Sequence, residues 1–321
     1  MSKLSNLPCQ LSNLPFTSFD TWYNWFNNHT WNRTNWNISD LSVAKYAYTV
    51  SVVLPALNEE KTIAAVVKSI VPLVGILVDE LIVMDSGSID NTKVDAKFAG
   101  AQVNNLETTT LGITPKLGKS EVLWQSLATT SGNIIVFIDS DLINPDPMFV
   151  PKLLGPILTS NTIRFVKGFY KRLFSENGIY YTSNGGRVNE LVARPLLSLL
   201  KPELGFILQP LGGEYAGTRE LLSRLSFATG YGVEIGILVD TYHQLGLEAI
   251  AQVNLGLRMH RNRPLSELAT MSREIIATLL SRCGIKSSPI STNRVLSKNE
   301  KISSETFLIS LEDRPPIKII L

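Results

Sequence analysis

The sequence lacks the features that mark several special classes of protein. Two cysteines, Cys9 and Cys283, occur among its 321 residues, which excludes a disulfide framework and indicates a reducing compartment. There is no run of about 18 apolar residues, and no basic segment followed by an apolar stretch near the start, so we expect neither a membrane-spanning helix nor a signal peptide. The formal net charge of +2 is too small to indicate a nucleic-acid surface. These absences predict a cytoplasmic protein with no membrane or nucleic-acid partner.

What is present is an apolar fraction of 44%, enough for a real core, and an alternation of strand-like and helix-like segments. Residues 50–54 and 80–84 are short apolar runs typical of buried strands, and each precedes a polar turn and a stretch with helical spacing. Pro55 is expected to end the first strand, and Asn58 to cap the helix behind it. This alternation predicts a parallel sheet, whereas the pattern beyond about residue 150 is mixed.

The most informative stretch is the apolar run at residues 134–138, which leads directly into Asp139, Ser140 and Asp141. Ligands of parallel α/β sheets bind just beyond the carboxyl ends of the strands. Residues i and i+2 of an extended segment point the same way, so the two carboxylates would converge if the segment stays extended. Two hard oxygen donors suit Mg²⁺ or Mn²⁺, which bind carboxylates together with substrate phosphates. Because the motif is short, a strand that ends in an Asp-Ser turn also explains it.

Four landmarks stand in order along the chain: the Pro-Ala-Leu-Asn-Glu-Glu loop at 55–60, Asp-Ser-Gly-Ser at 85–88, Asp-Ser-Asp at 139–141, and the late His260. Together they resemble nucleotide-sugar-dependent glycosyltransferases of the GT-A fold. Longer motifs closely resemble the glucosyl-3-phosphoglycerate synthase family, and they lie at residues 185–191, 209–217, 230–234 and 260–265. The resemblance covers about residues 40 to 285 and is far more specific than a lone Asp-x-Asp.

The resemblance implies an α/β fold of GT-A (Rossmann-like) type, in which a nucleotide-sugar domain with a mixed sheet precedes a more helical acceptor-binding half. We expect four parts: an aromatic arm at 1–48, a nucleotide-sugar-binding subdomain at 49–160, an acceptor-binding subdomain at 161–285, and a flexible tail at 286–321. The density of aromatic residues in the polar arm predicts that it packs on the main domain or on a second subunit. The arm and the resemblance both favour a homodimer.

The resemblance also implies which residues bind the nucleotide-sugar donor. The base and ribose would lie against the loop after the first strand and a serine after the second, while the phosphates and sugar would meet a lysine, the Asp-Ser motif and a glycine-rich loop. In this sequence the donor residues are Pro55, Ala56, Leu57, Glu59, Ser86, Lys119, Asp139, Ser140, Leu211 and Gly212. Their chemistry agrees, since a leucine can flank a flat base and a glutamate can accept from a ribose hydroxyl. A strand-to-helix turn with a favourable charge at the helix start would use the same residue types.

Metal binding and catalysis are carried over in the same way. Asp141 and His260 would bind the cation, and a carboxylate with an imidazole suits Mn²⁺ more readily than Mg²⁺. The cation stabilises the negative charge that develops on the leaving β-phosphate. The implied catalytic residues are Lys119, Asp139 and Glu234, and Glu234 would position an acceptor or sugar hydroxyl. The family retains the anomeric configuration, so the acceptor would attack on the face that the diphosphate leaves.

The acceptor implied by the resemblance is 3-phosphoglycerate, which carries a phosphate and a carboxylate. Gly186 and Arg187 at a helix start offer backbone amides and a guanidinium fork for such a ligand. Arg258 and Asn262 would add to the acceptor site. Asn189 departs from the family, which has threonine at this position, although an asparagine can still donate through its amide.

Several alternatives remain open on the sequence alone. The donor is expected to be UDP-glucose, with GDP-glucose possible, and a related mannosyl transferase would use GDP-mannose. A sugar nucleotidyltransferase would normally carry a glycine-rich loop with arginine and lysine after its first strand, where this chain has residues 55–60. A sugar-nucleotide-binding module without activity is the third possibility.

Overall fold

The structure is a computed structural model of the chain. It describes residues 16–33, 36–106, 112–116, 118–176, 179–183, 186–259, 265–285, 291–298, 301–308 and 312–321. Of the predicted site residues, His260 and Asn262 lie outside these ranges.

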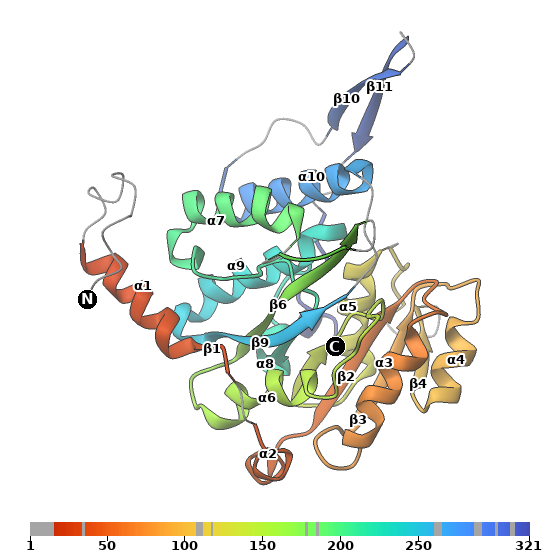
Figure 1. Ribbon diagram of the computed structural model, residues 1–321, viewed down its shortest axis with the longest axis vertical. Helices are drawn as coiled ribbons and strands as arrows, with labels where there is room; N and C mark the ends of the chain where they lie inside the picture. The colour runs from red at the N-terminus through yellow and green to blue at the C-terminus, as the bar shows by residue number, and fades with distance from the viewer. Residues whose placement is uncertain are drawn as a thin grey trace.

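A mixed sheet of nine strands runs through the middle of the molecule, in the order β1-β9-β6-β8-β5-β2-β3-β4 with β7 paired to β6 (Figure 1). Its strands are β1 Thr30–Trp31, β2 Val50–Ala56, β3 Glu80–Asp85, β4 Gln102–Asn105, β5 Ile134–Phe137, β6 Phe165–Glu176, β7 Ile179–Ser183, β8 Tyr215–Thr218 and β9 Ile250–Arg258. β2 to β5 pair in parallel, and β8 runs antiparallel between β5 and β6. The α/β class and the mixed sheet are therefore confirmed.

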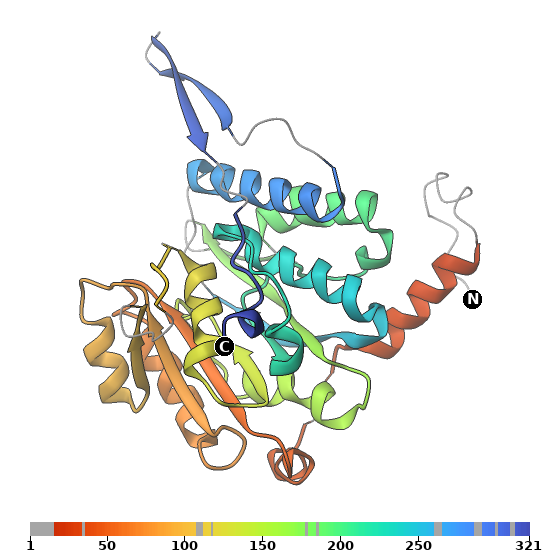
Figure 2. The same ribbon diagram turned by 180° about the vertical axis from the view of Figure 1, so that it is seen from behind.

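Helices cover both faces of this sheet (Figures 1 and 2). They are α1 Phe16–His29, α2 Ile38–Lys45, α3 Ile63–Ile70, α4 Thr92–Ala99, α5 Lys119–Thr129, α6 Phe149–Thr159, α7 Arg194–Leu200, α8 Arg219–Leu222, α9 Val233–Leu245 and α10 Leu265–Arg282. A short π-helical turn, Asn189–Ala193, leads into α7. Within the described part of the chain, none of the helices combines the length and the apolar character needed to cross a membrane.

Alternate residues of the central strands face two separate cores. Val52 and Leu54 of β2 belong to a core under α2, α3, α4 and α6, whereas Val53 belongs to a core with α5, α7, α9 and α10. Strands that are buried on both faces read as continuous apolar runs. This explains why the short runs in the sequence, rather than alternating patterns, marked the strands.

The described part of the aromatic arm, residues 16–33 and 36–48, packs on the main domain of its own chain. Trp25 of α1 is buried, and its indole N–H donates to the carbonyls of Leu247 and Ile250 at 2.9 and 3.2 Å. β1 then adds to the edge of the sheet parallel to β9. The arm thus extends the sheet behind the acceptor half.

The C-terminal residues differ from the expected flexible tail. Strands β10 Ser291–Lys298 and β11 Lys301–Leu308 form an antiparallel hairpin that projects from the body (Figure 1). Residues 312–321 return to the body and run beside α5 (Figure 2), where Ile317 is buried and Arg314 pairs with Glu121 of α5. The Ser, Lys and Glu content of this region predicted exposure to solvent. A few buried or ion-paired side chains are nevertheless enough to hold a terminal segment on the body of a protein.

The first strand and helix also differ in detail from the expectation. β2 continues through Pro55 to Ala56, and α3 begins only at Ile63 with Thr62 as its N-cap. Asn58 does not cap this helix. Its backbone is left-handed, with φ of 55°, and its side-chain oxygen accepts from the N–H of Ile89 at 3.0 Å. Asn58 therefore joins the loop after β2 to the loop after β3.

Candidate active site

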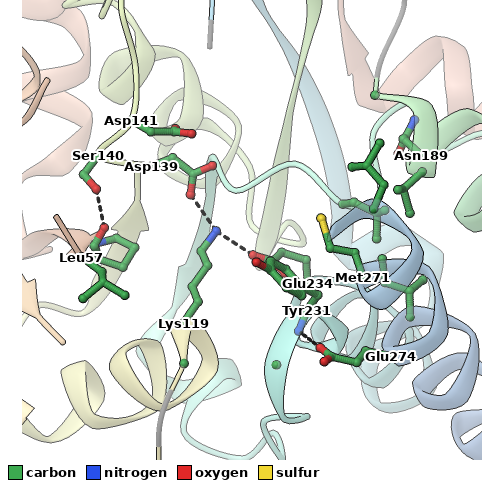
Figure 3. Close-up of a pocket in the computed structure, with 18 of the residues that line it drawn as sticks. Leu57, Lys119, Asp139, Ser140, Asp141, Asn189, Tyr231, Glu234, Met271 and Glu274 are labelled. Carbon is green, nitrogen blue, oxygen red and sulfur yellow. Dashed lines mark hydrogen bonds and ion pairs between the residues drawn. The ribbon is translucent and has the colours of Figure 1, made fainter. Parts of the chain in front are cut away.

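A cavity of about 680 Å³ opens at the carboxyl ends of β2 and β5 (Figure 3). It extends from the loops after β2 and β3, past the start of α5, to the π-helical turn and α10. The predicted site residues that line it are Pro55, Ala56, Leu57, Glu59, Ser86, Lys119, Asp139, Ser140, Asp141, Gly186, Arg187, Asn189, Leu211, Glu234 and Arg258. One continuous cavity thus brings most of the predicted donor and acceptor residues together, whereas Gly212 is not among the residues that line it.

The predicted donor end of the cavity is built by two loops that are hydrogen-bonded to each other. The N–H of Asn58 donates to the hydroxyl of Ser88 at 2.9 Å, and the hydroxyl of Ser86 donates to the carbonyl of Ala56 at 3.1 Å. Behind them, the buried carboxylate of Asp85 accepts from the N–H of Ser88. Leu57 is half exposed on this framework, where an apolar side chain can cover a flat base.

Lys119 lies at the centre of the cavity because it is the first residue of α5, immediately after Gly118. Its ammonium nitrogen is 2.6 Å from Asp139 Oδ1 and 2.8 Å from Glu234 Oε1 (Figure 3). Burial lowers the pKa of this lysine, but the charges of Asp139 and Glu234 outweigh burial and hold its pKa well above the usual value. A fixed positive charge therefore stands between the two predicted catalytic carboxylates.

The two aspartates after β5 converge on one guanidinium, although Ser140 and Asp141 form a turn and not the extended segment on which the i, i+2 prediction rested. Arg258 Nη2 is 2.9 Å from Asp139 Oδ2 and 3.0 Å from Asp141 Oδ1. Burial raises the pKa of Asp139, but Lys119 and Arg258 more than offset this and hold the pKa well below its usual range. Between the aspartates, the hydroxyl of Ser140 donates to the carbonyl of Pro55 at 2.6 Å. The end of β5 is thereby tied to β2.

The residues present fit a hard divalent cation. Asp139 and Asp141 both line the cavity, and their side chains are 20% and 28% exposed. Carboxylate oxygens are the donors that Mg²⁺ and Mn²⁺ prefer. Within the described ranges no cluster of three or more His, Cys, Asp or Glu side chains could hold a metal, and the predicted partner His260 follows β9 outside those ranges. Its role stays a prediction.

The acceptor end contains Gly186, Arg187 and Asn189. Arg187 is exposed, whereas Asn189 is buried on the π-helical turn. The side-chain amide of Asn189 donates to Glu190 Oε1 at 2.9 Å and to the carbonyl of Leu208 at 3.2 Å, while its Oδ1 has no partner among the described residues. Both amide hydrogens are thus engaged within the protein, contrary to the expectation that this amide can donate to a ligand.

Arg258 has more partners than its expected acceptor role required. Besides the two aspartates, its Nη1 lies 2.9 Å from the buried Glu214, and it donates to the hydroxyl of Tyr170. Burial raises the pKa of Glu214 to about 7, against the opposing effect of Arg258. Arg258 therefore joins the two aspartates after β5 to Glu214 and to Tyr170 of β6. Its contact with the acceptor stays a prediction.

Several residues of the site were not found from the sequence. Glu214 follows the predicted glycine-rich loop, and Lys167 stands within an apolar strand, which is a rare place for lysine. Leu268 and Met271 of α10 line the cavity, as does Glu274, whose carboxylate accepts from the N–H of Tyr231 at 2.7 Å (Figure 3). The sequence showed that α10 has an apolar face. Helical spacing alone, however, predicts a face that packs in the core and not one that lines a cavity.

The sheet, the donor loops and the paired aspartates define a glycosyltransferase of the GT-A fold, and residues 51–224 match the family model described as glycosyl transferase family 2. A glucosyl-3-phosphoglycerate synthase of Mycolicibacterium smegmatis is 59% identical over 295 residues, covering 92% of this chain and 97% of its own length. One of Petrotoga mobilis is 43% identical over 84% of this chain and 86% of its own. The chain therefore belongs to the glucosyl-3-phosphoglycerate synthase family.

Solved structures agree with this assignment. The Mycobacterium tuberculosis glucosyl-3-phosphoglycerate synthase in complex with Mn²⁺, UDP and phosphoglyceric acid is 57% identical, covers 91% of this chain and 98% of its own, and gives a TM-score of 0.84. The same enzyme has been solved with Mn²⁺, UDP-glucose and phosphoglyceric acid, with a TM-score of 0.83 over 91% of this chain and 98% of its own. These matches each cover 91% of this chain, so most of its fold is shared with the solved structures.

Proposed function

We propose that this chain transfers glucose from UDP-glucose to 3-phosphoglycerate and forms glucosyl-3-phosphoglycerate, with Mn²⁺ or Mg²⁺ bound. The observation that carries the proposal is the position of Lys119, which holds Asp139 and Glu234 at 2.6 and 2.8 Å in the middle of one cavity. The same cavity is lined by the predicted nucleotide residues of the loops after β2 and β3 and by the predicted acceptor residues Gly186, Arg187 and Asn189. The relatives crystallised with UDP-glucose and phosphoglyceric acid support the same pair of substrates.

The donor would lie along the loops after β2 and β3, with its diphosphate toward the end of β5. Asp141 and His260 would hold the cation, which supplies electrostatic stabilisation to the leaving diphosphate when bound. The chain's own contribution is a set of charges fixed before the substrate arrives. Because Lys119 already contacts two carboxylates, it needs little rearrangement to stabilise a developing negative charge.

Retention of configuration is part of the proposal. In a glycosidase that works through a covalent intermediate, a carboxylate approaches the sugar from the face opposite the leaving group. Here Asp139 and Glu234 both point at the same ammonium, so their charges are engaged in positioning rather than set on opposite sides of a sugar. The acceptor hydroxyl would then attack on the face that the diphosphate leaves, and Glu234 would orient a hydroxyl there.

Release of UDP tests the function directly. The wild type, Asp141→Ala and His260→Ala are given UDP-glucose with Mn²⁺ or Mg²⁺, with and without 3-phosphoglycerate. We expect release that requires both acceptor and metal, and that falls at least about 100-fold in both variants, since one electrostatic contact of this kind is worth 10²–10³ in rate. Asp95→Ala on α4 serves as the control, because Asp95 is not among the residues that line the cavity, and this variant should behave as the wild type.

Other outcomes assign other functions. Acceptor-dependent release from GDP-glucose or GDP-mannose, but not from UDP-glucose, would change the donor. Pyrophosphate as the product would indicate a nucleotidyltransferase, and no release with any donor would leave only a binding module. We also propose a cytoplasmic homodimer, which the family resemblance supports, and a monomeric mass by light scattering would contradict it.

A further inference from the structure

Lys167 is a buried ammonium that the proposed mechanism does not use. It lies in β6 between Phe165 and Phe169, and its side chain is 1% exposed. A lysine is almost never fully buried without a charged partner, yet no carboxylate lies within ion-pair distance of Lys167 in the described part of the chain. Such a charge costs stability, so its presence in the sheet needs another reason.

The contacts of Lys167 all go to one stretch of chain. Its ammonium donates to the carbonyl of Gly212 and lies 4.8 Å from the centre of the Tyr215 ring. The N–H of the neighbouring Gly168 donates to the carbonyl of Glu214 at 2.8 Å. Two residues of β6 therefore bind backbone carbonyls of the loop that precedes β8.

The hydrogen bond from Lys167 sets the orientation of the peptide group between Gly212 and Gly213. In a trans peptide the carbonyl and the following N–H point in opposite directions. Because the carbonyl of Gly212 points at Lys167, the N–H of Gly213 points to the other side. Gly213 lies next to Asp139, a residue that lines the cavity, since a Cβ on Gly213 would collide with both carboxylate oxygens of Asp139, and no partner for its N–H occurs among the described residues.

We propose that Lys167 is a positioning residue for the donor sugar: it holds the Gly212 carbonyl so that the Gly213 N–H is presented to a hydroxyl of the glucosyl group. The inference rests on the proposed function, because it assumes a nucleotide sugar in this cavity. Burial lowers the pKa of Lys167 to about 8, so the ammonium remains protonated at neutral pH and holds the carbonyl through a charged hydrogen bond.

The test compares the binding of UDP with that of UDP-glucose, each with Mn²⁺, by calorimetry. Lys167→Met keeps the length and burial of the side chain but removes its donor. We expect the Kd for UDP-glucose to rise at least fivefold while the Kd for UDP changes less than twofold. Lys167→Gln, which retains a donor on a shorter side chain, should give an intermediate ratio of the two constants and provides a second variant if the first does not fold.

A merely structural role would not change this ratio. Thr241→Val is the matched control, because Thr241 is fully buried in α9 and its hydroxyl donates to the carbonyl of Ile237. It should lower Tm and leave the ratio unchanged. Equal weakening of both ligands in Lys167→Met and Lys167→Gln, or no weakening, would overturn the inference. Failure of the wild type to bind UDP-glucose would instead overturn the proposed function.

Discussion

The side-chain amide of Asn189 is already engaged within the protein. Both of its amide hydrogens go to Glu190 and the Leu208 carbonyl, although the position lines the acceptor end of the cavity. A threonine hydroxyl is a rotatable donor and can turn to an anionic ligand. We expect Asn189→Thr to lower the KM for 3-phosphoglycerate by about fivefold, on the order of 1 kcal/mol for one such hydrogen bond.

Steady-state kinetics at saturating UDP-glucose measures this change. The KM for UDP-glucose is the internal control, because the donor end of the cavity lies away from Asn189. Asn189→Ala removes the amide without adding a donor and should not improve the acceptor KM. An increase in the acceptor KM of Asn189→Thr would show that the phosphate does not bind at this position.

Glu274 gives a pH dependence of stability whose sign follows from its surroundings. Burial raises the pKa of this carboxyl, against the opposing hydrogen bond from the Tyr231 N–H. The folded state therefore holds the proton to higher pH than the unfolded state. The stability from this group is fully present below the unfolded pKa of about 4.5 and is lost as pH rises through the folded pKa.

Glu274→Gln tests this, because glutamine still accepts from the Tyr231 N–H but does not titrate. Urea unfolding of the wild type and the variant is compared from pH 4 to pH 8. We expect the variant to gain stability relative to the wild type as the pH rises from about 4.5. A constant difference across this range would show that Glu274 titrates alike in the folded and unfolded states.

At the scale of elements, the C-terminal segment holds α5, the helix that begins with Lys119. Arg314 Nε is 2.6 Å from Glu121 Oε2, and its Nη2 is 2.9 Å from Glu121 Oε1. The indole of Trp124, one turn later on α5, donates to the carbonyl of Pro315 at 2.7 Å. Since Glu121 is only two residues from Lys119, this clamp fixes the end of the helix that enters the cavity.

Removing one partner of this pair should be strongly destabilising. Glu121 is 1% exposed, so Arg314→Met leaves a buried carboxylate without its cation and should lower the free energy of unfolding by about 3 kcal/mol or more. Urea denaturation at pH 7 measures it. Arg224→Met is the matched control, because the Arg224–Glu220 pair is 46% and 70% exposed and should cost less than about 1 kcal/mol. Equal losses would contradict the clamp.

Helices and strands were predictable from the sequence where the pattern of apolar residues along a short segment determines them. β2, β3, β5 and the long α10 followed from apolar runs and helical spacing. Pro55 was misread as a strand end, because a parallel strand tolerates a missing N–H where no ladder bond is needed. The C-terminal segment was misread because its anchors, Arg314 and Ile317, are two residues in a polar context whose partners lie far away in the sequence.

At the scale of the whole molecule, the site joins groups that only the fold brings together. Arg258 contacts Asp139 across 119 positions of sequence. The motifs pointed to most of the predicted donor residues that line the cavity and to the two aspartates, because these follow strands whose carboxyl ends share one edge of the sheet. They did not show that Arg258 also contacts Glu214, or that Lys167 donates to the carbonyl of Gly212. Those contacts depend on β8 lying between β5 and β6.

The metal links the cavity to the stability of the whole chain. A ligand that binds only the folded state stabilises it by about 2.7 kcal/mol at 100 times its Kd, which raises Tm by roughly 5 °C for a chain of this size. We expect UDP with Mn²⁺ to give such a shift, EDTA to remove most of it, and Asp141→Asn to keep only the part that UDP gives alone. Asp146→Asn, a carboxylate on the same loop that does not line the cavity, is the control and should retain the full shift. A metal-dependent shift that survives in Asp141→Asn would place the cation elsewhere and would leave the paired aspartates as structural partners of Arg258.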